Sequence, residues 1–178
     1  LVKSSAASDV YKRQDMNNTT ISGLATIYGA MGYGYYNSYE LDFFKITNNT
    51  FTHFAGYTTL NGAIAWNDEC MRVLGGDGNI ISGNTFTDCG VGMFVGRSPY
   101  YYSHQTSEIG ADNLTITDNV FVDGGEMADI WIYFNNEAQS VDITGNEFST
   151  SGHAIDVEPG NTGDLLIQDN TIVGGDDD

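Results

Sequence analysis

The sequence predicts an all-β solenoid, and three observations carry this prediction. An internal repeat occurs five times, with isoleucine followed three residues later by asparagine and two residues after that by an apolar residue. The asparagines lie 35, 35, 27 and 24 residues apart, and the shortest interval is about one solenoid turn. The chain also has 22 Gly but only 2 Pro. The copies are Ile46-Asn49-Phe51, Ile81-Asn84-Phe86, Ile116-Asn119-Phe121, Ile143-Asn146-Phe148 and Ile167-Asn170-Ile172.

Each copy of the repeat predicts a short strand, with a turn at the asparagine between the isoleucine and the later apolar residue. Alternating apolar residues on such a strand place one row of side chains in a shared interior. The stacked asparagines are expected to be structural, passing side-chain amide hydrogen bonds from coil to coil. A second strand follows. Val95 lies nine residues after Phe86 and Val157 nine after Phe148, so the two valines are expected to stack.

The pattern Asn-x-Φ-x-x-x-Gly, as in Asn84, Phe86 and Gly90, resembles the repeat of pectate-lyase-like proteins. The resemblance covers about residues 41–173 and implies a right-handed parallel β-helix. Alginate epimerases and lyases, bacterial surface proteins and phage tailspikes share this repeat. Because the fold hosts lyases, hydrolases, epimerases and adhesive proteins, the resemblance implies architecture and leaves the activity open.

Three segments are expected along the chain. Residues 1–14 contain three of the six basic residues and lack the repeat, so we expect a non-native or disordered leader, with an amphipathic cap as the alternative. Residues 15–173 are expected to form the β-helix domain. Residues 174–178 form an acidic tail directly after the last repeat. Since solenoids need capping elements, we expect a fragment that lacks at least one cap.

Charge and composition limit the classes of partner that the chain is expected to bind. A net charge of −18 argues against nucleic acid and anionic membranes, which require basic patches. No run of 18 apolar residues occurs, so no membrane span is expected. Cys70 and Cys89 belong to no zinc or CxxC pattern, and either a disulfide between neighbouring coils or two free thiols is compatible with the sequence. The resemblance and the acidity together predict an extracellular or cell-surface location.

Outward positions on these second strands are the first place to expect a binding site. Stacking Phe134 between Val95 and Val157 in the interior places Trp131, Tyr133 and Asn135 on one outward face. Aromatic rings and nearby carboxylates suit a sugar platform, whereas a loop or another chain covering the rings is the alternative. The outward columns expected from this stacking are Phe94, Tyr133 and Asp156, then Gly96, Asn135 and Glu158, and Gly92, Trp131 and Ala154.

Asp156 and Glu158 stand two residues apart in a stretch similar to the Ile-Asp-x-Glu-Pro segment of many β-helix repeat proteins. Both carboxylates project from one face of a strand, at a separation that glycosidases use for acid and base catalysis. A raised pKa on one of two like charges would suit a proton donor. A calcium site and a solvated acidic turn are the alternatives.

An insertion between Val95 and Ile116 carries further candidates. It contains Arg97, Tyr101 and His104, and these residues form the best set for a lyase, which must neutralise a uronate carboxylate and remove a proton. A surface loop without a ligand is the alternative. The sequence lacks the aspartate-proline-histidine stretch of alginate epimerases and the paired aspartates of polygalacturonases.

Two functions follow from these observations. The first is a secreted domain that binds polysaccharide and processes it as a lyase, hydrolase or epimerase, with Ca²⁺ needed if the polymer is acidic. The second is a non-catalytic β-helix segment of a surface protein, adhesin or tailspike-like protein. Catalytic candidates are Asp156, Glu158, Arg97 and His104; substrate-binding candidates are Trp131, Tyr133, Asn135, Phe94 and Tyr101.

Overall fold

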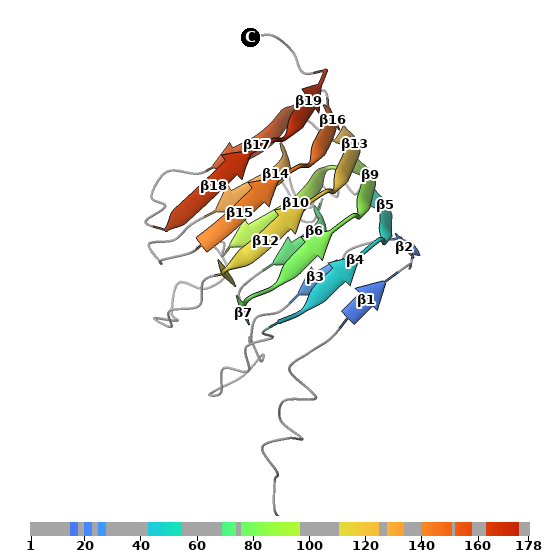
Figure 1. Cartoon of the computed structure of the whole chain (residues 1–178). Helices are drawn as coiled ribbons and strands as arrows, with labels where there is room; N and C mark the ends of the chain where they lie inside the picture. The colour runs from blue at the N-terminus through green and yellow to red at the C-terminus, as the bar shows by residue number, and fades with distance from the viewer. Residues whose placement is uncertain are drawn as a thin grey trace, which may run out of the picture.

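The chain folds as a parallel β-helix, as the repeat predicts. Successive coils add short parallel strands to three sheets, named here A, B and C. Each sheet runs along the length of the stack (Figure 1). Within the described residues no helix is long and apolar enough to cross a membrane. The computed structural model describes residues 15–17, 20–22, 25–27, 43–54, 69–73, 76–96, 111–124, 128–133, 140–150, 152–157 and 163–174.

Every sheet is ordered along the coil axis. Sheet A contains β1 (Asp15–Asn17), β4 (Lys45–Thr47), β8 (Ile80–Ser82), β12 (Leu114–Thr117), β15 (Ser140–Thr144) and β18 (Asp164–Gln168). Sheet B contains β2 (Thr20–Ser22), β5 (Thr50–Phe54), β9 (Thr85–Cys89), β13 (Val120–Gly124), β16 (Glu147–Thr150) and β19 (Thr171–Val173). Sheet C contains β3 (Ala25–Ile27), β6 (Glu69–Val73), β10 (Val91–Gly96), β14 (Ala128–Tyr133) and β17 (His153–Val157). A separate two-stranded sheet pairs β7 (Gly76–Asp77) with β11 (Ala111–Asp112).

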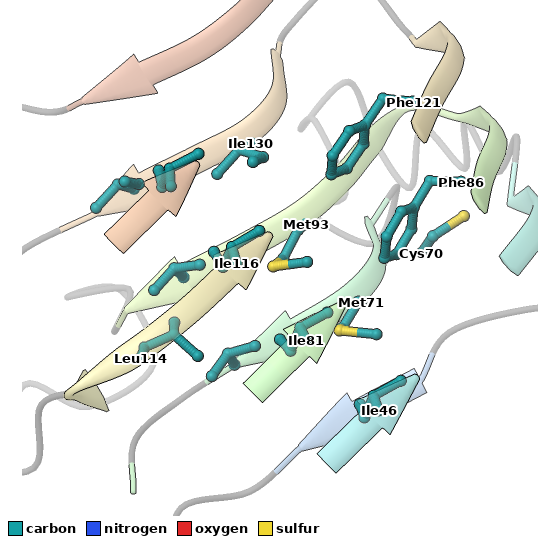
Figure 2. Packing of buried hydrophobic residues seen from close by; sticks show 14 of the residues in the cluster. Ile46, Cys70, Met71, Ile81, Phe86, Met93, Leu114, Ile116, Phe121 and Ile130 are labelled. Carbon is teal, nitrogen blue, oxygen red and sulfur yellow. The ribbon is translucent and has the colours of Figure 1, made fainter. Parts of the chain in front are cut away.

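The interior is built from columns of identical or similar side chains. Ile46, Ile81 and Ile116 are buried in register on neighbouring strands of sheet A, and Figure 2 shows them one above another. The phenylalanines of sheet B form a second column with nearly parallel rings. Centroids of Phe86 and Phe121 lie 4.8 Å apart with planes 7° from parallel, close to the spacing of adjacent strands. Each coil therefore buries its apolar residues against the coils above and below it.

A buried asparagine ladder runs along the turn between sheets A and B. The backbone N–H and side-chain Nδ2 of Asn84 both donate to Oδ1 of Asn119, each at 3.0 Å. Asn84 Nδ2 also donates to the carbonyl of Ile46 on the preceding coil. The same arrangement continues through Asn146, and all these groups are paired without water. The structural role predicted for the asparagines is confirmed.

The residue before each ladder asparagine has a positive φ. The left-handed conformation is tolerated mainly by glycine, asparagine and aspartate, and only these three residue types occur at this position. The tight turn thus explains a second sequence pattern in the repeat, beside the asparagine itself. The residues are Asn48, Gly83, Asp118, Gly145 and Asp169.

Candidate functional site

Sheet C carries the part of the predicted site that the structure describes. Phe94, Trp131 and Asp156 occupy one register column across β10, β14 and β17. Tyr133 ends β14 opposite Gly96, and nothing is described of its side chain. The remaining candidates lie outside the described residues; they are Asn135, Glu158, Arg97, Tyr101 and His104.

The expected register of this sheet is wrong by two residues on β14. Ile132, and not Phe134, lies between Val95 and Val157 in the interior column. The stacking of Val95 and Val157 in one column is confirmed, with Ile132 as the residue between them.

The shift arises because the corner after Phe121 is shorter than expected: Ile132 lies 11 residues after Phe121 and Phe134 lies 13 after it, compared with nine from Phe86 to Val95. The pairing of β13 with β16 slips between Val122 and Gly124, where two residues on β13 correspond to one step on β16. The corner before β14 is therefore longer than the corners before β10 and β17. Because side chains alternate along a strand, a shift of two residues keeps Trp131 on the outer side but changes its neighbours.

Trp131 and Phe94 are buried, so the expectation of an exposed aromatic platform is wrong. Only 5% of Trp131 and 4% of Phe94 is exposed. Their rings meet edge to face, with centroids 5.4 Å apart and planes at 87°, a favourable geometry for aromatic pairs. Val91 and Ala128 join them in a cluster separate from the interior. All four residues of this cluster are buried.

Asp156 is the more accessible end of the same column. It lies opposite Trp131 on β17, the outermost strand of sheet C, and is half-buried. The column therefore changes from two covered aromatic rings to a carboxylate at the open edge of the sheet. A carboxylate beside an aromatic residue at an accessible edge can accept hydrogen bonds from sugar hydroxyls.

His153 is a candidate that sequence reasoning missed. It pairs with Ala128, which in turn pairs with Val91, and both of those residues belong to the outer cluster. The next two residues on β17, Ala154 and Ile155, both pack against the interior. His153 is exposed, so strand β17 presents an imidazole and the Asp156 carboxylate on its outer side.

A single signal in the sequence could have revealed His153. At the start of β10, β14 and β17 the side chains do not alternate strictly between the two faces of the sheet. Two neighbouring positions at the corner both face inward. On β10 these positions are Gly92 and Met93: a Cβ on Gly92 would lie 2.7 Å from the Phe121 ring, which places it toward the interior. Strict alternation would have turned His153 the wrong way.

Cys70 and Cys89 form a disulfide, which the sequence left open. The bond joins β6 of sheet C to the end of β9 in sheet B, and the two Cα atoms are 5.6 Å apart. Both residues are buried in the interior cluster. The cross-link fastens two neighbouring coils at their corner and closes a loop of chain between them, which restricts the unfolded state.

Within the parts of the chain that the structure describes, no group of three or more His, Cys, Asp or Glu side chains is placed to hold a metal ion. Asp77 and Asp112 pair in register on β7 and β11, and Asn113 Nδ2 donates to Asp77 Oδ1 at 2.7 Å. Partial burial, and then the charge of Asp77, raises the pKa of the Asp112 carboxyl.

Comparisons with known proteins add no functional assignment. The chain matches no protein-family model, and no curated protein or solved structure matches it significantly.

Proposed function

We propose that this chain is an extracellular β-helix domain, similar to pectate-lyase-like proteins, that binds polysaccharide at the open edge of sheet C. The observation that carries the proposal is the outer column that ends in Asp156. Trp131 and Phe94 are buried in the same column on the neighbouring strands, and the half-buried carboxylate lies on the edge strand together with exposed His153. A strand that presents polar groups beside packed aromatic residues suits recognition of sugar hydroxyls.

The disulfide supports the extracellular location. Disulfides persist in oxidising compartments and are rare in the cytosol, so the Cys70–Cys89 bond favours export. The net charge of −18 fits a neutral glycan directly. An acidic polymer would need Ca²⁺ between its carboxylates and those of the protein, and Asp156 is the described residue best placed to contribute one ligand.

Processing of the bound polymer is the second step of the proposal. Asp156 with Glu158 would serve a hydrolase as acid and base, whereas Arg97 and His104 would serve a lyase by neutralising a uronate and moving a proton. The two reactions differ in product, since elimination creates an unsaturated sugar that absorbs ultraviolet light and hydrolysis creates only new reducing ends.

The test is a binding and turnover screen against alginate, pectate, chondroitin and neutral glycans, with Ca²⁺ or with a chelator. Asp156→Asn preserves shape and removes the charge, and we expect about a tenfold loss of affinity for a bound glycan, equivalent to ~1.4 kcal/mol. Asp142→Asn is the matched control, because Asp142 is an exposed carboxylate on β15 in sheet A. Equal affinities of Asp156→Asn and the parent chain would contradict the location of the site.

A non-catalytic repeat segment of a surface protein, adhesin or tailspike-like protein is the second candidate. The observation that favours it is a row of uncharged side chains in register on sheet B over three coils. There Thr50, Thr85 and Val120 stand in register, and so do their neighbours two positions later. A folded chain that binds none of the glycans and releases no product would support this candidate over the first.

A further inference from the structure

Phe43 is an exposed aromatic residue at the corner through which the chain enters sheet A. It stands two residues before β4, and 59% of it is exposed. Its φ of 57° lies in the left-handed region, which is unfavourable for a bulky side chain. In the described part of the chain, every other non-glycine residue with a positive φ is asparagine or aspartate. Phe43 is therefore an outlier in residue type at this backbone conformation.

The stack itself fixes the backbone of this corner. The N–H of Phe43 donates to the carbonyl of Asp77 at 2.8 Å, and the N–H of Gly78 donates to the carbonyl of Asp112 at 3.0 Å. Phe43, Gly78 and Asn113 occupy equivalent positions on successive coils, and all three have positive φ. Glycine and asparagine suit this conformation better than phenylalanine does. The sequence thus keeps an aromatic residue where either of the other two types would be less strained.

The ring of Phe43 lies against the backbone of Gly78. A Cβ added to Gly78 would stand 2.8 and 2.9 Å from ring carbons Cδ1 and Cε1, so a side chain there would require the ring to move. Gly78 therefore provides a backbone support for the ring, while more than half of the residue stays exposed. An aromatic ring held on one side and open on the other suits stacking on the apolar face of a sugar.

Polar side chains continue this corner on the next coil. Asn113 is exposed, and its Nδ2 donates to Asp77 Oδ1 at 2.7 Å. An amide also has a second N–H and an acceptor oxygen, so this bond orients the group and leaves capacity for sugar hydroxyls. Asp112, which precedes Asn113, is exposed as well. The carboxylates of Asp77 and Asp112 disfavour phosphate or uronate groups at this corner.

We propose that Phe43 and Asn113 form a second carbohydrate subsite, which takes a neutral glycan at the corner before sheet A. The ring stacks on the C–H face of one sugar, and the amide bonds to a hydroxyl. Nucleic-acid bases also stack on aromatic rings, but the net charge of −18 opposes their phosphates. The proposal rests on the proposed function for its class of ligand and uses other residues, since Asp156 lies on β17 at the far edge of sheet C from β3.

The test is isothermal titration calorimetry with the neutral glycans xylan and glucomannan and, for comparison, acidic pectate. Phe43→Leu keeps an apolar side chain but removes the flat ring, and we expect about a tenfold loss of affinity for the neutral glycan. Phe43→Tyr keeps the ring, and its affinity is expected to stay within about twofold of the parent. Asn113→Gly keeps the left-handed turn without the amide, and we expect about a threefold loss or more.

A stability measurement separates a binding ring from a structural one. Phe43→Asn introduces a residue type that suits the left-handed conformation, so we expect Tm to rise or to stay within about 2 °C of the parent while affinity falls. Val173→Asn is the matched control, because Val173 is an apolar residue of similar exposure, 55%, on β19 in sheet B. Its affinity for the neutral glycan is expected to equal that of the parent.

Asp156→Asn in the same titrations distinguishes this subsite from the edge of sheet C. Affinity lost in Phe43→Leu alone supports the corner and contradicts the edge, whereas affinity lost in Asp156→Asn alone overturns the corner and keeps the edge. Equal affinities of Phe43→Leu and Phe43→Tyr would also overturn the corner, and so would a Tm of Phe43→Asn more than about 2 °C below the parent. A parent chain that binds neither neutral glycan would overturn it whatever its affinity for pectate.

Discussion

The turn between sheets A and B and the corner that enters sheet C follow different rules. At the turn, the five copies of the repeat share the same residue types, and Asn84, Asn119 and Asn146 bond in the same way to their neighbours. At the corner, the inward column contains a half-cystine, a glycine, an aspartate and an alanine, and the register slips by residues that one coil has and others lack. These corner residues are Cys70, Gly92, Asp129 and Ala154, and all four are buried.

This contrast shows where the fold leaves room for variation. The ladder must be the same on each coil because every rung is both donor and acceptor for the next. The corner has no such requirement, so different residues and lengths are accommodated there, and insertions change which side chains meet on the outer face of sheet C. The candidate site lies on the variable side, as binding residues commonly do.

The largest effect is expected from breaking the ladder at its centre. Asn119→Ala leaves two buried donors of Asn84 without an acceptor and removes the donors to Ile81 and Asn146. We expect a loss of about 4 kcal/mol in unfolding free energy, measured by urea denaturation followed by circular dichroism. Asn170→Ala is the control. That rung is half-buried, water can replace part of its bonding, and we expect less than half the loss; equal losses would argue against the ladder as a cooperative element.

The second effect concerns the outer cluster of sheet C. Trp131→Ala removes a buried indole from its contact with Phe94, and we expect a loss of about 3 kcal/mol. An exposed sugar platform would instead lose glycan affinity at nearly unchanged stability. The denaturation midpoint of this variant distinguishes a buried indole from an exposed platform. A stability within about 0.5 kcal/mol of the parent would indicate that Trp131 is exposed.

A smaller effect is expected at the corner itself. In Gly92→Ala the added methyl group would stand 2.7 Å from both the Asp129 carbonyl oxygen and a carbon of the Phe121 ring. We expect a loss of about 2 kcal/mol from this overpacking, again by urea denaturation. An unchanged unfolding free energy in Gly92→Ala would mean that Gly92 faces away from the interior. The inference that two neighbouring corner residues face inward, which places His153 on the outer side of β17, would then be wrong.

The smallest effect belongs to the two-stranded sheet of β7 and β11, which contributes surface charge and little core. The pKa of Asp112 is raised above its ordinary value of 3.8, so its ionised form costs stability as the pH rises through the folded-state value. Asp112→Asn is expected to be slightly more stable than the parent at neutral pH, with the difference disappearing toward pH 3. Stability scans across pH measure this; a larger gain at acid than at neutral pH would contradict the assigned cause.

Much of the stack could be predicted from the sequence because its period is carried by the side chains that bond to one another. The five Ile-x-x-Asn-x-Φ copies predict the buried isoleucine and phenylalanine columns and the turn between them, and the intervals between asparagines match the rungs of the ladder. The asparagine, glycine or aspartate before each rung also follows from the left-handed turn. The asparagines stack in one register, so their spacing in the sequence predicts which of them are neighbours in the ladder.

Sheet C could not be predicted as well because its register depends on corners of unequal length. The insertion after Phe121 is two residues shorter than expected, so Trp131 occupies the place expected for Tyr133. In addition, the two inward positions at the corner break the alternation from which outward residues were assigned. Burial of Trp131 and Phe94 depends on what covers them, and no local pattern reports this. The roles expected of Glu158, Arg97 and His104 lie outside the described residues and stay predictions.

The most direct test of this account is the environment of Trp131. The chain has two tryptophans, so Trp66→Phe leaves Trp131 as the single reporter of fluorescence. We predict a blue-shifted emission that iodide quenches only weakly and that shifts to longer wavelength when urea unfolds the chain. Emission at the unfolded position with full quenching in the folded protein would show that the indole is open to solvent, and would contradict both the register of sheet C and the covered outer cluster.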